Sequence, residues 1–358
     1  MATNRRPGDD GVTTAPRSAF GAEFVGAPGF LNSATYGVPP TFLVGALQDR
    51  IADWQAGTMD VPAFDESVRR GRAAYAALVG VGTGSVTMGG SVSALLGLVA
   101  AAVPDGARVA TLTGEFTSTT FPFAAQAARG VTVTEMTGAE LIASAADYDV
   151  VVASLVQSAD GAVLDVEGLR TALADADTIT VLDVTQAVGW KVLDLGWVDV
   201  TAAAVYKWLL APRGTAWMSL SDRVSRSMTP HFANWYAGEA PWSTIYGLPL
   251  RLAEDGRRFD TSPAWFSVLG ASLTMPWLAD LDRNAVEVHC LGLATRLRTA
   301  LGLPAMDSAI VSLPMAEAAE RLAGAGLRAS VRAGAVRVGF HLYNTEDDLQ
   351  RLLDALAG

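Results

Sequence analysis

The sequence predicts an α/β protein in which helices cover both faces of a mostly parallel sheet. Between residues 85 and 220, short β-branched apolar runs alternate with helical segments rich in Ala and Leu. The apolar runs are nearly continuous, which is typical of strands that are buried on both faces. Hydrophobic residues make up 50% of the 358 positions and charged residues 18%, so the chain can form a large core.

The strands and helices of this region can be predicted from the same alternation. The strands cover residues 108–113, 131–136, 149–155, 178–183, 200–205 and 214–220. The helices cover residues 91–103, 120–128, 138–146 and 166–174. In open sheets of this kind, ligands bind beyond the carboxyl ends of the strands. We therefore expect functional residues directly after these strands.

The pattern changes after residue 265, which predicts three parts of the chain. Residues 266–358 are expected to form a smaller α+β domain, and residues 26–265 the large α/β domain. The small domain has predicted helices at 268–281, 285–301 and 346–357 and strands at 309–313 and 336–340. Residues 1–25 are rich in Gly, Pro, Thr and Asp, which predicts a flexible arm.

Charge and composition exclude several classes of function. The net charge of -11 disfavours nucleic acid and anionic membranes as partners, because phosphate binding requires clustered positive charge. The longest apolar run, 91–103, is too short to cross a membrane, and the N-terminus lacks the apolar core of a signal peptide. We therefore expect a cytoplasmic protein. With one cysteine, Cys290, and three dispersed histidines, no disulfide within the chain and no metal site are expected.

Lysine usage identifies the first candidate residue. Only Lys191 and Lys207 are lysines among the 26 basic residues, and the others are arginines. Arginine stays protonated and cannot condense with an aldehyde, whereas a desolvated lysine amine can. Lys207 follows the predicted strand 200–205, while nothing around Lys191 indicates a site. Lys207 is therefore the candidate for covalent attachment of an aldehyde cofactor.

Asp183 is the matching candidate on the neighbouring strand. It ends the predicted strand 178–183, where a buried carboxylate is costly unless it meets a cation. The protonated pyridine nitrogen of pyridoxal phosphate (PLP) would be such a cation, and the pairing would keep the ring an electron sink. Lys207 comes 24 residues later, one strand and one crossover along the chain, so both side chains can reach one crevice. Gln186 is expected to hydrogen-bond the phenolate oxygen of the cofactor.

Two further segments fit such a cofactor. Gly90, Ser91 and Val92 open the predicted helix 91–103, and free amides at a helix N-terminus bind phosphate. Gly-Ser is equally an ordinary helix start. Phe116 follows the strand 108–113, where it either stacks on the pyridine ring or belongs to the core.

Together these segments resemble the class V aminotransferase family of fold-type I PLP-dependent enzymes, which includes cysteine desulfurases, isopenicillin N epimerase-like proteins, kynureninase-like enzymes and C–S lyases. The resemblance covers nearly the whole chain, from Leu31-Asn32-Ser33-Ala34 to the segment that runs from Arg337 to Thr345. Its most specific pieces are Asp183 with Gln186, Tyr206-Lys207-Trp208-Leu209, and the spacing of Arg337 to Tyr343-Asn344-Thr345.

The resemblance implies roles for further residues. Arg337 would bind the substrate carboxylate, with Asn32, Ser33 and Ala34 as further substrate-binding residues. Gln157 or Ser158 would lie near the cofactor substituents. The segment 259–263 resembles a loop whose hydroxyl reaches the phosphate in the partner subunit, so Ser262 implies a homodimer with shared sites. Many relatives carry His at the position of Tyr206 and Ser at that of Ala204, which opens the question of what contacts the phosphate here.

The resemblance also implies the reaction. Transamination of an α-amino acid through a Lys207 Schiff base is the first expectation, with C–S β-elimination and epimerisation as alternatives. Phe116 can stack on the ring but cannot titrate, so Lys207 would be the main acid–base group. Cys290 lies within a helical pattern, which disfavours a desulfurase that uses a mobile thiolate. A pseudoenzyme that serves as an interaction module is also compatible, whereas the absence of G-x-G-x-x-G disfavours a nicotinamide enzyme.

The role of one aromatic segment has two interpretations. Residues 234–239 combine aromatic and small side chains, and Trp242 and Tyr246 follow them. Exposed aromatic residues often mark interfaces. The segment is therefore expected to line either the substrate entrance or the dimer interface.

Overall fold

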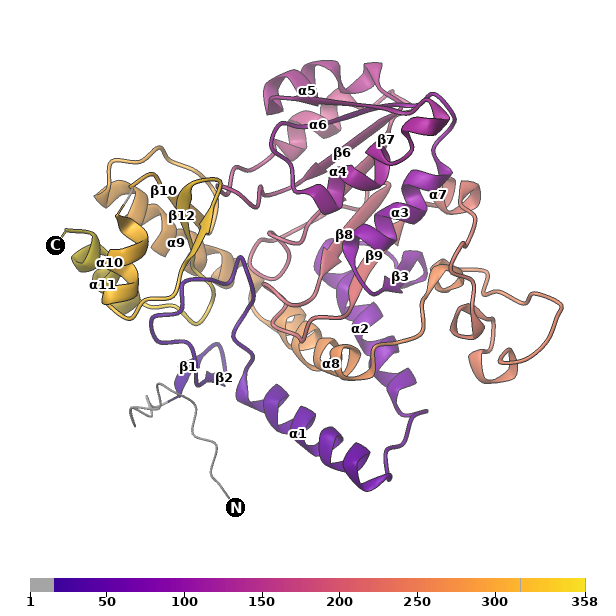
Figure 1. Ribbon diagram of the computed structural model, residues 1–358, viewed down its shortest axis with the longest axis horizontal. Coiled ribbons are helices and arrows are strands. Elements are labelled where there is room, and N and C mark those ends of the chain that lie inside the picture. The colour runs from indigo at the N-terminus through magenta and orange to yellow at the C-terminus, as the bar shows by residue number, and fades with distance from the viewer. Residues whose placement is uncertain (1–15, 316, 358) are drawn as a thin grey trace.

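The computed structural model describes residues 16–315 and 317–357, and its centre is a seven-stranded sheet (Figure 1). The strand order is β3-β9-β8-β7-β6-β4-β5, and the strands from β8 to β5 are parallel. Only β9 runs against its neighbours in this sheet. The bounds are β3 (Val86–Gly89), β4 (Arg108–Leu112), β5 (Thr132–Met136), β6 (Val150–Ser154), β7 (Ile179–Asp183), β8 (Val200–Ala204) and β9 (Ala216–Leu220). The predicted α/β class is confirmed.

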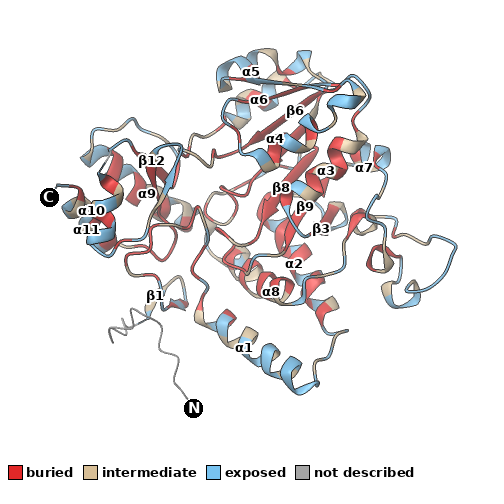
Figure 2. Ribbon diagram, in the orientation of Figure 1, coloured by how far each residue is buried: buried red, intermediate tan, exposed pale blue. Residues whose placement is uncertain are grey.

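Helices cover both faces of this sheet, as the apolar strands require. Along β6, Val150 and Val152 join one core cluster, while Val151 and Ala153 join the other, because successive side chains of a strand point to opposite faces. The first face is covered by α3 (Val92–Ala102), α4 (Thr117–Ala124) and α7 (Asp222–Ser227). The other is covered by α2 (Phe64–Val79), α5 (Gly138–Ser144), α6 (Val166–Ala172) and α8 (Trp265–Asp280). Figure 2 shows the sheet as a buried layer between them.

A second, smaller unit lies beside the large one and contains a three-stranded antiparallel sheet of order β10-β12-β11 (Figure 1). Its elements are α9 (Arg283–Ala300), β10 (Ile310–Leu313), α10 (Ala318–Gly324), β11 (Ser330–Arg332), β12 (Ala335–Gly339) and α11 (Glu346–Ala357). Its core includes Leu31 from the N-terminal region, which enters the small unit through bridges at Phe30 and Asn32.

Two segments lie near the predicted domain boundaries. Helix α8 buries Val268, Ala271 and Met275 in a core cluster that also contains Val286 and Cys290 of α9, so the boundary at residue 266 stays a prediction. The flexible arm was predicted for residues 1–25, of which 1–15 lie outside the described residues. Within the rest, β1 (Arg17–Ala19) and β2 (Ala22–Phe24) form a hairpin that is held by an ion pair between Arg17 and Asp348.

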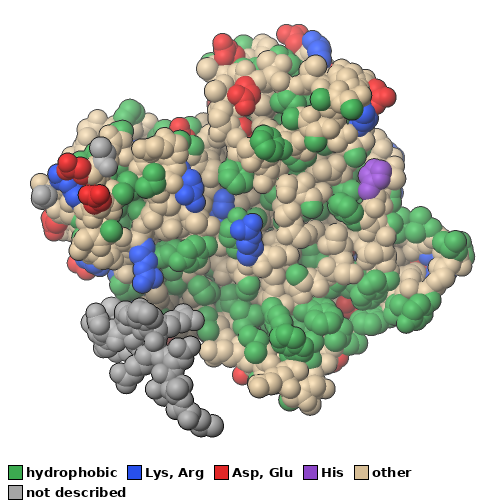
Figure 3. Space-filling model, in the orientation of Figure 1, with side chains coloured by type: hydrophobic (Ala, Val, Ile, Leu, Met, Phe, Trp, Pro, Cys, Tyr) green, Lys and Arg blue, Asp and Glu red, His purple; other side chains and the backbone are tan. Residues whose placement is uncertain are grey.

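Two exposed features complete the molecule. Helix α1 (Thr41–Ala56) exposes four large apolar side chains, those of Phe42, Val44, Ile51 and Trp54. In Figure 3, hydrophobic side chains gather over the region where Figure 1 draws α1 and α8. Residues 228–259 form an irregular excursion in which Tyr246 and Leu248 are largely exposed. Across the described residues, no helix combines the length and apolarity needed to cross a membrane.

Candidate active site

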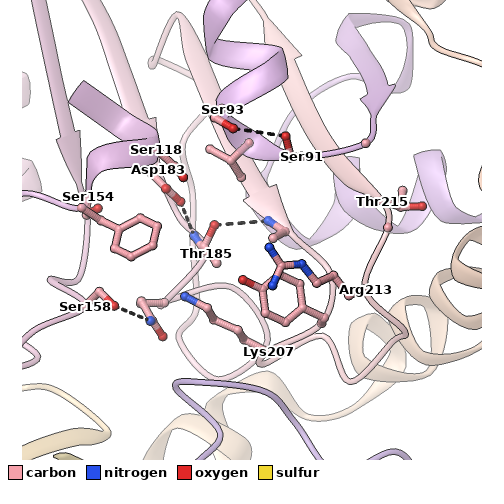
Figure 4. Close-up of a pocket in the computed structure, with 17 residues that line it drawn as sticks. Ser91, Ser93, Ser118, Ser154, Ser158, Asp183, Thr185, Lys207, Arg213 and Thr215 are labelled. Atoms are coloured by element: carbon pink, nitrogen blue, oxygen red, sulfur yellow. Dashed lines mark hydrogen bonds between the residues drawn. The ribbon is translucent and has the colours of Figure 1, made fainter. Parts of the chain in front are cut away.

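A cavity lies at the carboxyl ends of the parallel strands (Figure 4). Strand β6 contributes Ser154, β7 contributes Asp183 and β8 contributes Ala204. The N-terminus of α3 and the turn that leads into β9 close the cavity from the side. This is the position expected for ligands in an open parallel sheet.

Lys207 lies in this cavity just beyond β8. The residue is 7% exposed, and among the described residues its amine has no hydrogen-bond or ion-pair partner. Burial lowers the pKa of Lys207 to about 8, although the nearby carboxylate of Asp183 acts in the opposite direction. The amine lies 5.5 Å from the ring centre of Phe116 and 5.9 Å from that of Tyr206. A buried amine with a lowered pKa is neutral, and hence nucleophilic, at mildly alkaline pH.

Asp183 faces the same cavity from the end of β7 (Figure 4). Its Oδ1 accepts a hydrogen bond of 2.8 Å from the amide of Thr185, and its Oδ2 accepts one of 3.2 Å from the hydroxyl of Thr119. The hydroxyl of Thr185 accepts in turn from the amide of Ala204 on β8. Asp183 is buried with two neutral donors, which leaves the carboxylate able to pair with a cation in the cavity.

The N-terminus of α3 forms the wall through Gly90, Ser91, Val92 and Ser93. Ser91 caps the helix, since its hydroxyl accepts from the amide of Ala94 at 3.2 Å. The first amides of a helix have no partner within it and carry the positive end of the helix dipole. This end of the cavity therefore suits a phosphate group.

Phe116 and Glu115 follow β4. Phe116 is 46% exposed and lines the cavity, so it does not belong to the core. Glu115 was not predicted and is buried beside the cavity, where its carboxylate accepts two hydrogen bonds of 2.6 Å from Ser154 and one of 3.1 Å from Gln157. Burial raises the pKa of Glu115, while the hydrogen bonds from Ser154 act in the opposite direction. The sequence signal that could have identified Glu115 is an acid shortly after an apolar strand, and a similar signal identified Asp183.

The amide of Gln186 is fully engaged within the protein. Its Nε2 donates to the carbonyl of Ala34 at 3.0 Å and to the hydroxyl of Ser158 at 3.1 Å. Its Oε1 accepts from the indole of Trp208 at 2.8 Å. Gln186 and Ser158 line the cavity, whereas Gln157 turns to Glu115 outside the cavity wall. A bond from Gln186 to a phenolate would have to replace one of these contacts.

Arg337 lies behind Ser158 and is 1% exposed. It donates to the carbonyl and hydroxyl oxygens of Ser158, to Thr35 at 2.9 Å and to Ser330 at 3.3 Å. None of these partners is an acid, and burial lowers the pKa of Arg337 to about 10. The guanidinium is thus a buried cation without a counter-ion among the described residues.

Besides Gln157 and Arg337, four predicted residues lie outside the cavity wall. Ser33 is buried and shares a hydrogen bond of 2.6 Å with the hydroxyl of Tyr343, and Asn32 and Ala34 likewise do not line the cavity. Ser262 is exposed and does not reach the cavity of its own chain. Conversely, the cavity contains residues that were not predicted, namely Ser93, Ser118, Ser154, Thr185, Arg213, Gly214 and Thr215.

The comparisons with known proteins agree with this geometry. The model of the family described as aminotransferase class-V matches residues 90–305, which include every strand of the large sheet from β4 to β9. The chain belongs to the class-V aminotransferase family. It is 24% identical over 213 residues to the uncharacterized aminotransferase YcbU of Bacillus subtilis (strain 168), which covers 55% of this chain and 56% of that protein. It is 30% identical over 235 residues to isopenicillin N epimerase of Amycolatopsis lactamdurans, which covers 57% of this chain and 58% of that protein.

The family fold also appears among solved structures. The cystine C-S lyase C-DES, in complex with its reaction product cysteine persulfide, superposes with a TM-score of 0.81 at 19% identity over 92% of this chain and 97% of that one. At this identity the likeness concerns the fold alone, which is fold-type I. The matches to the two curated relatives span little more than half of their lengths.

The residues of this class-V site fit pyridoxal phosphate. The cofactor presents an aldehyde, a ring nitrogen and a phosphate. For the aldehyde, Lys207 offers an amine that has no partner among the described residues. For the ring nitrogen, Asp183 offers a buried carboxylate, and for the phosphate, the N-terminus of α3 offers free amides. Phe116 offers an aromatic face beside the amine.

Proposed function

We propose that this class-V family member is a PLP-dependent enzyme that acts on an α-amino acid, with Lys207 as the covalent anchor of the cofactor. The observation that carries the proposal is that the amine of Lys207 and the carboxylate of Asp183 enter one cavity from neighbouring strands. Lys207 is a buried residue, and its amine opens onto the cavity without a hydrogen-bond or ion-pair partner among the described residues, which leaves it available to a ligand.

Each residue has a chemical task in this proposal. When bound, pyridoxal phosphate withdraws electrons from the α-carbon of an amino acid and so weakens the bonds to that carbon. Asp183 holds a proton at the ring nitrogen through its carboxylate. Lys207, with its lowered pKa, accepts and returns the proton of the α-carbon. Phe116 offers the face of its ring to the cofactor ring.

Arg337 is proposed to bind the α-carboxylate of the substrate. Among the described residues its charge has neutral partners only, so a carboxylate would supply the missing counter-ion. Ser158 separates the guanidinium from the cavity, and a carboxylate that replaces the Ser158 hydroxyl would reach Nη1 of Arg337, the nitrogen that donates to Ser158.

Transamination is the first candidate reaction, in keeping with the family. Epimerisation is the second, and the 30% identity to isopenicillin N epimerase favours it. A C–S lyase remains compatible with the same residues. A desulfurase that uses a thiolate is disfavoured, because Cys290 is buried in the core and burial raises the pKa of its thiol.

We also propose that the protein is a homodimer with shared sites. Ser262 is exposed outside its own cavity, which leaves it available to a second subunit. The exposed apolar side chains of α1, such as Phe42 and Trp54, would be covered in such an assembly. Light scattering of the purified protein measures the mass, and a monomer at micromolar concentration would contradict this part.

The test of the anchor is reduction with borohydride. The purified protein loaded with the cofactor should absorb in the visible range, and borohydride should fix the chromophore on the peptide that contains Lys207. Lys207→Ala should lose the adduct, whereas the control Lys191→Ala should keep it, since Lys191 pairs with Glu287 away from the cavity. An adduct that persists in Lys207→Ala would overturn the proposal.

The reaction is assigned with a panel of amino acids. Amino transfer that depends on a keto acid identifies an aminotransferase, while pyruvate with ammonia or sulfide identifies a lyase. Loss of optical activity without a change of mass identifies an epimerase. A bound cofactor whose spectrum responds to no amino acid would indicate a pseudoenzyme that acts as an interaction module.

A further inference from the structure

Arg213 enters the same cavity from the turn between β8 and β9 (Figure 4). Its guanidinium carbon lies 5.0 Å from the ring centre of Tyr206, the residue directly before Lys207. Among the described residues, the Arg213 side chain forms no hydrogen bond to an acceptor and no ion pair. A cation that is held over an aromatic face keeps its N–H groups at the edge free for another partner.

The cavity wall carries more cations than carboxylates, although the chain as a whole is acidic. Its ionisable wall residues include two cations, Lys207 and Arg213, and one carboxylate, Asp183. The net charge of the chain is -11. Lys207 is buried and unpartnered among the described residues, and it points into the same space, which indicates that this space is built for a ligand. The N-terminus of α3 adds the positive end of its dipole at Gly90 and Ser91.

Few other side chains at this end of the cavity can neutralise an anion. Ala204 presents a methyl group, and its amide donates to Thr185. The hydroxyls of Ser91 and Ser93 hydrogen-bond each other at 3.2 Å. Of the two cations, Lys207 is needed for the aldehyde in the proposed function. Arg213 is therefore the side chain left to pair with a phosphate.

We propose that Arg213, stacked on Tyr206, binds the phosphate group of the cofactor and encloses it against the N-terminus of α3. This inference rests on the proposed function and adds to it a residue that recognises the negative charge of the phosphate. Tyr206 positions the guanidinium by stacking and Arg213 donates to the phosphate oxygens. Arg213 is exposed and lines the cavity, so its side chain can reach a phosphate there.

The experiment compares two aldehydes that differ only in the phosphate. The dissociation constants of pyridoxal phosphate and of pyridoxal are measured for the protein freed of cofactor, from the absorbance of the adduct with Lys207. Arg213→Met should weaken pyridoxal phosphate about 10- to 100-fold, because one charge-assisted pair is lost, and should leave pyridoxal unchanged within about twofold. Inorganic phosphate should compete with pyridoxal phosphate for the wild-type protein, and much less for the variant.

The controls separate this role from general effects of charge and folding. Arg332→Met removes a cation that also lowers the pKa of Lys207 but does not line the cavity, and it should leave the ratio of the two constants unchanged. Tyr206→Phe keeps the stacking face and should bind pyridoxal phosphate more tightly than Tyr206→Leu. Thermal unfolding of Arg213→Met should match the wild type, since the side chain is exposed.

Two outcomes would overturn the inference. One is an unchanged affinity of Arg213→Met for pyridoxal phosphate, and the other is an equal loss for both aldehydes, which would mean that Arg213 acts on the amine or the fold. If neither aldehyde forms an adduct with the wild-type protein, the proposed function itself has failed, which is a distinct result.

Discussion

The carboxylate of Glu115 accepts two hydrogen bonds of 2.6 Å from Ser154, one from its amide and one from its hydroxyl. Glu115 follows β4 and Ser154 ends β6, so the pair ties two neighbouring strands together at the edge where the cavity opens. The same carboxylate accepts from the amide of Phe116 at 2.7 Å. A buried acid thus holds the backbone of a residue that lines the cavity.

Replacing this acid should destabilise the protein. Glu115→Gln turns one acceptor into a donor that faces other donors, which should lower the free energy of unfolding by about 1–3 kcal/mol. Denaturant unfolding of the protein freed of cofactor measures the change. The control Glu135→Gln changes an exposed residue of β5 and should stay within about 0.5 kcal/mol of the wild type. Equal stability of both variants would mean that the Glu115 contacts contribute little.

Gly37 should be intolerant of any side chain. A Cβ at this position would overlap the carbonyl oxygen of Lys207 and the side chain of Leu210, and the Gly37 amide donates to the carbonyl of Tyr206 at 2.9 Å. Gly37→Ala should therefore displace the segment that carries Lys207. We expect a loss of about 2 kcal/mol or more of stability and at least about tenfold weaker cofactor binding, as measured by unfolding and by absorbance titration.

A second glycine provides the control for this substitution. Gly45 lies within α1, and a Cβ there would have nothing within 4 Å. Gly45→Ala should stabilise the protein by up to about 1 kcal/mol, because alanine favours the helix. If Gly37→Ala behaved like Gly45→Ala, the contact between Gly37 and Lys207 would not restrict the site.

The large sheet could be predicted because its strands are buried on both faces. The apolar run at 149–155 contains β6 (Val150–Ser154), and the run at 178–183 contains β7 (Ile179–Asp183). By contrast, the hairpin of β1 and β2 was predicted as part of an arm. Its strands have three residues each and are held by Asp348, more than 300 positions away. Such a contact leaves no periodic signal in the sequence.

The residues of the candidate site also differ in how far the sequence predicts them, according to whether they adjoin a regular element or depend on distant contacts. Lys207, Asp183, Phe116 and Ser91 could be located because each follows or precedes a regular element at the edge where ligands bind. Gln157 or Ser158 was expected near the cofactor substituents. Ser158 lines the cavity, whereas Gln157 turns to Glu115, a partner that only the folded sheet brings near.

Arg213 was missed for a related reason. Its position depends on the turn after Lys207, in which Leu210 adopts a left-handed backbone conformation at φ 60°. The ring of Tyr206 then supports the guanidinium over the cavity. Neither feature has a spacing that marks it in the sequence, because a left-handed leucine is an exception that tertiary packing imposes.

Substitution of Arg337 should weaken binding of the substrate and leave binding of the cofactor unchanged. In the proposed role its planar fork pairs with a carboxylate, so Arg337→Lys should weaken the binding of an amino-acid substrate by about 10- to 100-fold. Spectral titration of the loaded protein measures that constant. The affinity for pyridoxal phosphate should stay unchanged, since Arg337 does not line the cavity.

Arg298 offers the matched control for Arg337. It is also buried and donates to carbonyl oxygens, those of Met306, Ser308 and Ile310, but it lies in α9 away from the cavity. Arg298→Lys should lower stability and leave the affinity for the substrate unchanged. Equal effects of both variants on substrate affinity would exclude a specific role of Arg337.

Lys207 should make the stability of the cofactor-free protein depend on pH. Burial lowers its pKa from 10.5 to about 8 in the folded state. Below pH 8 the amine is charged in both states, and the folded state carries the full cost of burying that charge. Between about pH 8 and 10.5 the unfolded chain binds more protons than the folded one, so the contribution of Lys207 to stability rises with pH. The total change is on the order of 3 kcal/mol.

Lys207→Met isolates this contribution, because all other groups titrate in both proteins and cancel in the difference. The variant should gain stability over the wild type at pH 7, and the gain should shrink as the pH rises through 8 toward 10.5. Denaturant unfolding at pH 7 and pH 10 measures both values. Lys191→Met should instead be less stable than the wild type at pH 7, since it loses the ion pair of 3.0 Å with Glu287. A difference between Lys207→Met and the wild type that stays constant from pH 7 to 10 would mean that the buried amine keeps its ordinary pKa, and with it too little neutral amine to anchor an aldehyde readily.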